Sequence, residues 1–263
     1  MAKIYNPRYE TMERKELEAL QLKRLQDMVD YCIKRVPFYQ ERLTAAGIVS
    51  GKQIETLADI AKIPFTTKED IRNNYPDGFL AVPKREVVRI HASSGTTGKP
   101  TVMCYTQNDM DVWADAAARV LCLNGVDEED VLQISVGYGL FTGALGFHYG
   151  AEKIGCAVVP ASTGNTQKQL VMLRDIGATA LMATPSYATY LSDLICQSET
   201  TAGDLKLTRV LLGAERCTKS MRKTIEEKKQ EIDELEKEVL KREEALLNES
   251  EELEKLKLEG EWK

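Results

Sequence analysis

The chain has 263 residues, 43% of them apolar, and a net charge of −6, so it is long and apolar enough for one large domain or two. Its acidic excess lies almost entirely in residues 222–263, and the nearly neutral remainder lacks the basic face that nucleic-acid binding requires. No apolar run is long enough to predict a membrane span. Six scattered cysteines without a Cys-x-x-Cys pair, and only two histidines, predict free thiols in a reducing cytoplasm and no metal site.

Residues 1–85 are predicted to form a helical N-terminal segment. Apolar side chains recur at three- and four-residue intervals over residues 17–32, which is the spacing of one helical face. A proline ends this pattern, and a second helix is expected over residues 38–46. Farther on, Thr67 and Asp70 form a capping-box pattern that predicts the start of a short helix.

A polar loop joins two predicted strands, which cover residues 86–90 and 101–105. The loop, residues 93–99, reads Ser-Ser-Gly-Thr-Thr-Gly-Lys and so holds four hydroxyl groups, two glycines and one lysine. Hydroxyls, backbone amides and an ammonium group all donate hydrogen bonds to phosphate oxygens, and glycines allow close approach of the backbone to a ligand. We therefore predict a loop that binds phosphate groups. A simple hairpin with a polar tip is the alternative.

Two familiar glycine-rich patterns do not fit this loop. The Walker pattern needs four residues between its glycines, whereas only two separate Gly95 from Gly98, and Pro100 follows the lysine. The dinucleotide-binding pattern is absent as well. Because a strand rather than a helix follows the loop, the lysine and hydroxyls must bind phosphate without a helix dipole.

Residues 86–221 are predicted to form an α/β core. A helix is expected to start at the capping box of Thr106 and Asp109 and to end at residues 124–125. Beyond it, strands are predicted over residues 131–135, 156–160, 179–183 and 209–212, and helices over residues 143–154, 166–175 and 186–196. This alternation is typical of a doubly wound, mostly parallel sheet, which binds ligands at the carboxyl ends of its strands. The loops at residues 136–141, 160–164 and 213–215 occupy such positions.

Residues 222–263 are predicted to form a long charged C-terminal helix. Apolar residues recur there every seven positions, without an interrupting glycine or proline, at Ile225, Ile232, Val239, Leu246 and Leu253. The second apolar seam of a coiled coil is only half formed. Self-association into a homo-oligomer, a helix that folds back on the body and a charged tail therefore remain three open interpretations.

Several motifs carry a family resemblance. Ser-Ser-Gly-Thr-Thr-Gly-Lys-Pro is similar to the ATP-phosphate loop of the adenylate-forming acyl- and aryl-CoA synthetases. Further segments resemble the phenylacetate–CoA ligase family, at residues 5–7, 20–25, 36–39, 64–70, 137–143 and 213–215. The resemblance covers about residues 4 to 227 and concerns the N-terminal half of the family's sequence.

The resemblance implies a reaction in two steps. A carboxylate attacks the α-phosphate of ATP to give an acyl-adenylate and pyrophosphate, and the thiol of CoA then displaces AMP. It implies ATP, Mg²⁺ and CoA as cofactors and a small aromatic carboxylic acid as substrate. Such a reaction needs neutralisation of phosphate charge rather than a protein nucleophile.

The resemblance also assigns site residues. The phosphates would be bound by Ser93, Ser94, Gly95, Thr96, Thr97, Gly98 and Lys99. Of these, Thr96 and Lys99 would have the catalytic role. The turn that lines adenine and the acyl group would be Gly213, Ala214 and Glu215, and the aryl-acid slot would contain Tyr138, Phe141 and Gly143. An aromatic side chain beside glycines gives a flat apolar slot, although ordinary core packing is the alternative for Phe141.

Four nearby residues are assigned no catalytic part. Arg216 and Cys217 stand where the family has a proline and an aromatic residue, which leaves the outer wall of the slot undefined. For His148 we favour a structural role over contact with a ligand. Ser186 is predicted to be a helix N-cap, since no companion base for a nucleophile is found in the sequence.

The family's later motifs are not found after Glu227. They are a Tyr-Gly-x-[ST]-Glu loop, an aspartate for the ribose, a hinge arginine and an adenylation lysine. We therefore expect an aryl-acid–CoA ligase chain that is weakly active or inactive alone. The alternatives are a non-catalytic domain that binds a nucleotide or aryl acid and assembles through its C-terminal helix, and complementation by a second chain.

Overall fold

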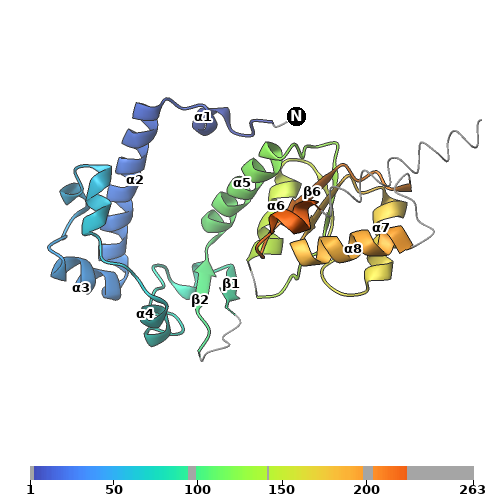
Figure 1. Cartoon of the computed structure of the whole chain (residues 1–263). Coiled ribbons are helices and arrows are strands. Elements are labelled where there is room, and N and C mark those ends of the chain that lie inside the picture. The colour runs from blue at the N-terminus through green and yellow to red at the C-terminus, as the bar shows by residue number, and fades with distance from the viewer. Residues whose placement is uncertain (1–2, 94–98, 141, 198–203, 224–263) are drawn as a thin grey trace, which may run out of the picture. The chain divides into compact units, whose positions relative to one another are not determined.

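The computed structural model describes residues 3–93, 99–140, 142–197 and 204–223 (Figure 1). These residues form two compact units. The first contains the residues up to Glu128 together with Gly137–Gly155, and the second contains Glu129–Val136 and the residues from Cys156 onward. No helix in the described ranges is long and apolar enough to cross a membrane.

The first unit begins with helices, as predicted. They are α1 (Pro7–Glu10), α2 (Arg14–Arg35), α3 (Pro37–Ala45) and α4 (Lys68–Asn73), with short 3₁₀ turns at Gly51–Gln53, Leu57–Lys62 and Lys84–Glu86. Their apolar faces meet in a small core of Val29, Leu43, Ile48 and Ile54. The capping box that was predicted for α4 is confirmed, because the Thr67 side chain accepts a hydrogen bond from the Asp70 amide and the Asp70 carboxylate accepts one from the Thr67 amide.

The remainder of the first unit is a β-ribbon and two packed helices. Strands β1 (Arg89–Ala92) and β2 (Val102–Tyr105) pair antiparallel and flank the predicted phosphate loop. Helices α5 (Gln107–Leu123) and α6 (Gly143–Lys153) pack closely because α6 presents glycines to α5. A Cβ atom on Gly146 would lie 2.2 Å from the Trp113 indole nitrogen, and one on Gly150 would lie 2.6 Å from the Ala117 Cβ atom.

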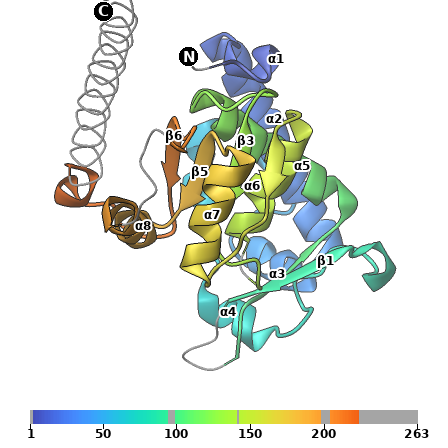
Figure 2. The ribbon, with the colours of Figure 1, turned by 90° about the vertical axis from the view of Figure 1, so that its right-hand side faces the viewer.

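The second unit is a parallel sheet with helices. Its strands are β3 (Val131–Ile134), β4 (Ala157–Val159), β5 (Ala180–Ala183) and β6 (Arg209–Leu212), in the spatial order β4-β3-β5-β6 (Figure 2). Helices α7 (Thr166–Ile176) and α8 (Pro185–Gln197) pack on β5 through a core that includes Leu170, Leu173, Leu181, Ala183 and Leu191. The mixed α/β fold and the helical N-terminal part are confirmed. The chain places β4 on one side of β3 and then β5 and β6 on the other side, which is the change of direction found in a doubly wound sheet.

Two predictions about helices have different outcomes. Ser186 was wrongly predicted to be the N-cap of α8. That helix begins at Pro185, and the Tyr187 amide donates to the Thr184 hydroxyl at 3.3 Å, so Thr184 is the cap. The long C-terminal helix lies outside the described residues beyond Lys223 and stays a prediction.

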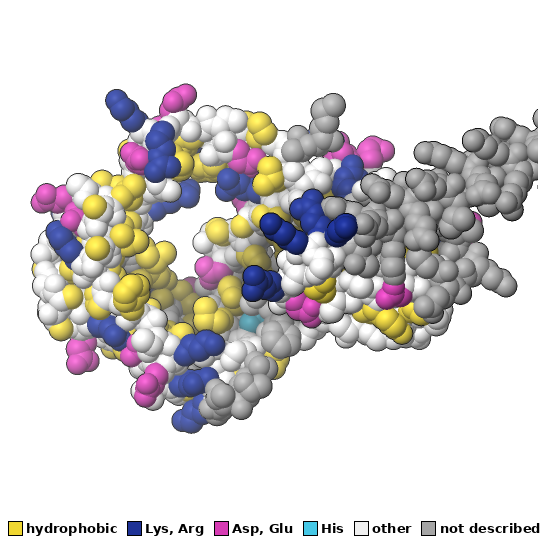
Figure 3. Space-filling view, in the orientation of Figure 1, with side chains coloured by type: hydrophobic (Ala, Val, Ile, Leu, Met, Phe, Trp, Pro, Cys, Tyr) yellow, Lys and Arg dark blue, Asp and Glu magenta, His cyan; other side chains and the backbone are white. Residues whose placement is uncertain are grey.

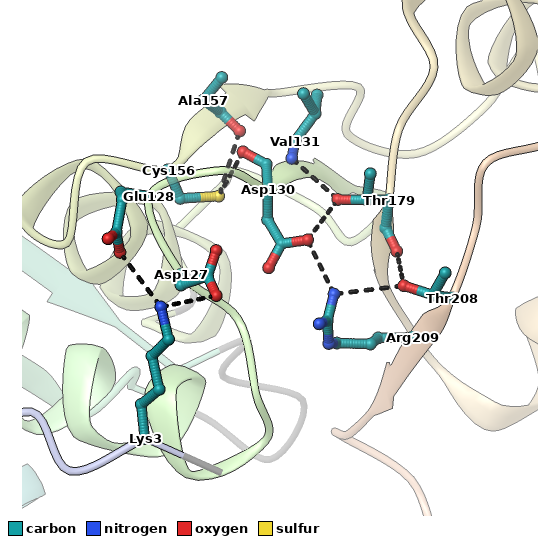
Figure 4. A network of polar contacts seen from close by, with 10 residues as sticks. All are labelled: Lys3, Asp127, Glu128, Asp130, Val131, Cys156, Ala157, Thr179, Thr208 and Arg209. Carbon is teal, nitrogen blue, oxygen red and sulfur yellow. Dashed lines mark hydrogen bonds and ion pairs between the residues drawn. The ribbon is translucent and has the colours of Figure 1, made fainter. Parts of the chain in front are cut away.

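A polar network ties the amino ends of three strands together in the second unit (Figure 4). The buried Asp130 carboxylate accepts hydrogen bonds from the Thr179 hydroxyl at 2.6 Å and from the Arg209 guanidinium at 2.7 Å. The Thr179 hydroxyl also accepts one from the Val131 amide at 3.0 Å. This network lies at the edge of the sheet opposite the carboxyl ends, so we assign it to the stability of the fold.

Candidate functional site

The predicted phosphate loop leaves and re-enters a β-ribbon. Where the loop begins and ends, the Ser93 amide donates to the Thr101 carbonyl at 3.0 Å, and the Thr101 amide donates to the Ser93 hydroxyl, also at 3.0 Å. At the far end of the loop, the Lys99 ammonium lies 5.7 Å from the centroid of the Tyr75 ring. The predicted residues Ser94, Gly95, Thr96, Thr97 and Gly98 lie outside the described residues.

The base of this loop is tied to the segment that carries the predicted aryl-acid slot. The Leu140 carbonyl accepts hydrogen bonds from the Ala92 amide at 3.3 Å and from the His91 ring at Nδ1, at 2.8 Å. His91 is buried and packs edge-on against the rings of Tyr105 and Trp113. The end of β1 therefore holds residues 138–140 next to the start of the phosphate loop.

Tyr138 is half-buried and hydrogen-bonded through its hydroxyl. Its Oη atom lies 3.2 Å from Nδ1 of His148, and Nε2 of His148 lies 3.1 Å from a carboxylate oxygen of Glu152, one turn along α6. Burial raises the pKa of Tyr138 to about 12, with smaller contributions from Glu152 and Tyr149. The phenol therefore keeps its proton in any physiological buffer.

The structure says less about the two other predicted slot residues, Gly143 and Phe141. Gly143 is the first residue of α6, and a Cβ atom there would meet nothing within 4 Å, so open space lies beside it. Phe141 lies outside the described residues. The structure thus brings Tyr138, Gly143 and both described ends of the phosphate loop into one unit, while the slot itself stays a prediction.

Gly213, Ala214 and Glu215 lie in the second unit, directly after β6, as predicted. The Gly213 amide donates to the Ala183 carbonyl at 3.2 Å, which continues the pairing with β5. Ala214 has a φ of 67°, a left-handed conformation that costs energy for any residue with a Cβ atom. The Glu215 carboxylate accepts hydrogen bonds from the Ser186 hydroxyl at 2.7 Å and the Ser186 amide at 3.3 Å.

Sequence reasoning missed three residues that form these contacts and gave Ser186 only the role of a helix cap. The three are His91, Glu152 and Arg89, whose guanidinium donates to the Tyr149 hydroxyl at 2.8 Å. One signal was available, since Ser186 follows the carboxyl end of β5 by only a few residues and ligands bind at such ends. The contacts of His91 and Arg89 join residues 49 and 60 positions apart and leave no local pattern.

Burial makes three of the described cysteines less reactive. Burial raises the pKa of the thiols of Cys32, Cys104 and Cys122, so each is a weaker nucleophile than a free thiol. Cys217 is exposed. In the described ranges, no group of three His, Cys, Asp or Glu side chains gathers in a way that could hold a metal ion.

The described residues of the first unit line a larger and a smaller hollow. The larger, of about 1880 Å³, is lined mainly by α2, β2 and α5, and apolar side chains cover much of its wall (Figure 3). The smaller, of about 410 Å³, lies beside β1 and β2 and is lined largely by apolar residues. None of the described candidate site residues lines either hollow.

A comparison of the sequence with curated proteins finds similar enzymes. The phenylacetate-coenzyme A ligase of Thermus thermophilus is 46% identical over 224 residues, which are 85% of this chain and 50% of that protein. The enzyme of the same name from Escherichia coli is 47% identical over 218 residues, which are 82% of this chain and 50% of that protein. The chain is a relative of the phenylacetate–CoA ligases. The resemblance predicted from its motifs is thereby confirmed.

The chain spans about half the length of the curated relatives that it matches. Among solved structures, 2-hydroxyisobutyryl-CoA ligase in complex with 2-HIB-AMP and CoA, in its thioesterification state, superposes with a TM-score of 0.79 and 27% identity, covering 84% of this chain and 49% of that one. An open conformation of that ligase gives the same TM-score at 25% identity, covering 86% of this chain and 50% of that one. No family model matches the chain.

Proposed function

We propose that the chain forms part of an ATP-dependent, AMP-forming ligase that adenylates an aryl carboxylate and then transfers the acyl group to CoA in the cytoplasm. The observation that carries this proposal is the pair of hydrogen bonds from β1 to the Leu140 carbonyl. They hold the start of a hydroxyl-rich loop beside the segment of Tyr138. A phosphate-binding loop next to an aryl-acid slot is what an adenylating site needs, and relatives named phenylacetate-coenzyme A ligase support this function.

In this proposal the chain stabilises charge and orients its ligands. The hydroxyls and amides of residues 93–98, with the Lys99 ammonium, bind the β- and γ-phosphates and so favour departure of pyrophosphate. We assign the catalytic role in this step to Thr96 and Lys99. Tyr138, Phe141 and Gly143 accept the aromatic ring, and Gly213, Ala214 and Glu215 line the adenine and acyl groups. No residue of the protein attacks the substrate.

Among the described residues, no three His, Cys, Asp or Glu side chains gather in a way that could hold a metal ion. Protein-bound Mg²⁺ in nucleotide enzymes is held largely by substrate phosphates and water, with one or two carboxylates. Mg²⁺ therefore belongs to the bound ATP in this proposal, and no separate step is assigned to it.

We further propose that the 263-residue chain adenylates weakly or not at all by itself. The family's ribose aspartate and adenylation lysine are not found in this sequence, and both stabilise the transition state. Binding of ATP and of the aryl acid is then the property to measure, with pyrophosphate release as a second assay. Pyrophosphate release at the rate of a full-length relative would contradict this part of the proposal.

Calorimetric titration with phenylacetate tests the substrate class. Gly143→Val should abolish binding, because the valine side chain extends into the open space where the ring is proposed to lie, and a Cβ atom at this position meets nothing within 4 Å. Gly139→Ala is a matched control, since a Cβ atom at Gly139 also meets nothing within 4 Å. Equal phenylacetate affinity in both variants would contradict the proposed slot.

A second candidate function is a non-catalytic domain that binds a nucleotide or aryl acid and assembles with another copy of itself through its C-terminal segment. The larger hollow of the first unit favours it, because about 1880 Å³ exceeds the size of ordinary small-molecule pockets. Sedimentation of the whole chain and of a variant ending at Glu227 separates the possibilities. An oligomer that becomes a monomer in the shortened variant supports assembly through the C-terminal segment, and a monomer in both cases contradicts it.

A further inference from the structure

Tyr138, His148 and Glu152 form a chain of hydrogen bonds that the proposed reaction does not use directly. The Tyr138 hydroxyl lies 3.2 Å from Nδ1 of His148, and the rings meet edge to face with centroids 5.7 Å apart. Glu152 contacts the opposite ring nitrogen, Nε2, at 3.1 Å. Each polar atom of the imidazole therefore has one partner.

The partners determine where the protons lie. A carboxylate only accepts hydrogen bonds, so the proton of a neutral His148 must be on Nε2, where it is donated to Glu152. Nδ1 then has a free lone pair and accepts a hydrogen bond from the Tyr138 hydroxyl. Tyr138 keeps that proton because burial raises its pKa.

A third neighbour restricts the ring of His148. The Tyr149 ring packs edge-on against it with centroids 5.4 Å apart, and Tyr149 is anchored in turn by Arg89. The Arg89 guanidinium donates to the Tyr149 hydroxyl and lies 4.8 Å from the centroid of that ring. The titratable groups facing His148 are therefore Tyr138, Tyr149 and Glu152, with Arg89 behind Tyr149.

The Glu152 carboxylate is 55% exposed, so its contact with His148 contributes little to the free energy of unfolding. Its effect is on orientation, because it selects one tautomer of the ring. The segment that carries Tyr138 is thus held at two points. Leu140 is bound to β1, and Tyr138 is bound to α6.

We propose that His148 is a positioning residue for the aryl-acid slot, which holds the Tyr138 side chain in one rotamer while Glu152 sets the tautomer of His148. This inference rests on the proposed function, since it assumes that Tyr138 lines that slot. It gives a specific purpose to the structural role that we favoured for His148 from the sequence, since both ring nitrogens bond to protein side chains. Because the Tyr138 hydroxyl donates its one hydrogen bond to His148, its ring face and the lone pairs of its oxygen are left to contact a ligand.

Phenylacetate titration of variants tests the role of His148. In His148→Asn the carboxamide oxygen replaces Nδ1 and can still accept from Tyr138, whereas in His148→Gln the carboxamide reaches only the position of Nε2. We expect His148→Ala and His148→Gln to weaken binding about fivefold, which corresponds to the loss of one hydrogen bond, and His148→Asn to restore it to within about twofold. Binding of Mg·ATP should be unchanged in all three variants.

A double mutant shows whether His148 acts through Tyr138. In the background of Tyr138→Phe, replacement of His148 by alanine should cause no further loss of phenylacetate affinity. A full additional loss in that background, or no rescue by His148→Asn, would overturn the inference.

Nitrogen-15 NMR tests the contact itself without any ligand. The chain has only two histidines, and the contacts predict opposite tautomers, with the proton on Nε2 in His148 and on Nδ1 in His91, where it is donated to the Leu140 carbonyl. The His148→Asn variant assigns the signals. A proton on Nδ1 of His148 would overturn the inference whatever the ligand does. The predicted tautomers without phenylacetate binding would instead overturn the proposed function alone.

Discussion

The two ends of the strands in the parallel sheet of the second unit are built differently. We call the side where the strands begin the amino edge and the side where they end the carboxyl edge. At the amino edge, the Asp130 carboxylate is buried and bonded to both Thr179 and Arg209 (Figure 4). At the carboxyl edge, Ala214 has a left-handed backbone and the exposed Glu215 side chain bonds to the start of α8. Removing one partner of a buried ion pair is strongly destabilising, whereas strain at an exposed turn persists where a site requires it.

The comparison teaches where each kind of mutation should act. Substitutions at the amino edge should lower the free energy of unfolding. The folded fraction of such a variant should bind its ligands with unchanged affinity. Changes at the carboxyl edge should have small effects on stability and larger effects on binding. The following substitutions test this contrast.

Asp130→Ala should have the largest effect on stability. It leaves the Arg209 guanidinium and the Thr179 hydroxyl without their shared acceptor, and we expect a loss of about 3 kcal/mol in the free energy of unfolding. Urea denaturation followed by circular dichroism measures it. A loss below about 1 kcal/mol would show that the network is no more than a surface ion pair.

Glu215→Ala should have an intermediate effect. The carboxylate bonds to Ser186 in the first turn of α8, and loss of such an anionic cap costs about 1 kcal/mol. Glu215→Gln is the matched control, since it keeps an acceptor and should retain about half of that stability. If the two edges differ as described, ATP affinity falls more in Glu215→Ala than in Asp130→Ala, and the reverse order would contradict the contrast.

Ala214→Gly should have a smaller effect, with the opposite sign. Glycine relieves the left-handed strain but raises the entropy of the unfolded chain, so we expect a net gain of about 0.5 kcal/mol. Thermal unfolding measured beside the wild type detects a change of this size. Destabilisation by this substitution would mean that the Cβ atom of Ala214 makes a contact that outweighs its strain.

Lys3→Ala should have the smallest effect and serves as a control for Asp130→Ala. Lys3 bonds to Asp127 at 2.9 Å and to Glu128 at 3.6 Å, but its side chain is 50% exposed. Exposed ion pairs of this kind contribute little to the free energy of unfolding, because water and salt screen them. A loss as large as that of Asp130→Ala would show that burial does not distinguish the two ion pairs.

Local features of the fold were predictable from the sequence. The strands β3, β5 and β6 and the helices between them lie within two residues of their predicted bounds, because turns, caps and hydrophobic period all mark them. The capping boxes at Thr67 and Thr106 are confirmed for the same reason. The first ribbon strand was placed too early, since residues 84–86 form a 3₁₀ turn and β1 begins at Arg89.

The contacts of the site were less predictable. The hydrogen bond between Tyr138 and His148 depends on how the loop after β3 folds onto α6, and the one between His91 and Leu140 joins distant segments. Neither leaves a periodic signal in the sequence. The division into segments 1–85, 86–221 and 222–263 remains a prediction, as do the roles of Thr96 and Phe141, which lie outside the described residues.

Calorimetric titration of Mg·ATP into the chain and into its Lys99→Ala variant tests the central claim most directly. That claim is that residues 93–99 bind the phosphates of ATP. We predict binding by the wild type that weakens about tenfold in the variant, because the ammonium group is a charged donor to phosphate. Phenylacetate affinity should not change. Equal ATP affinity in the two proteins, or no binding by the wild type, would contradict the account.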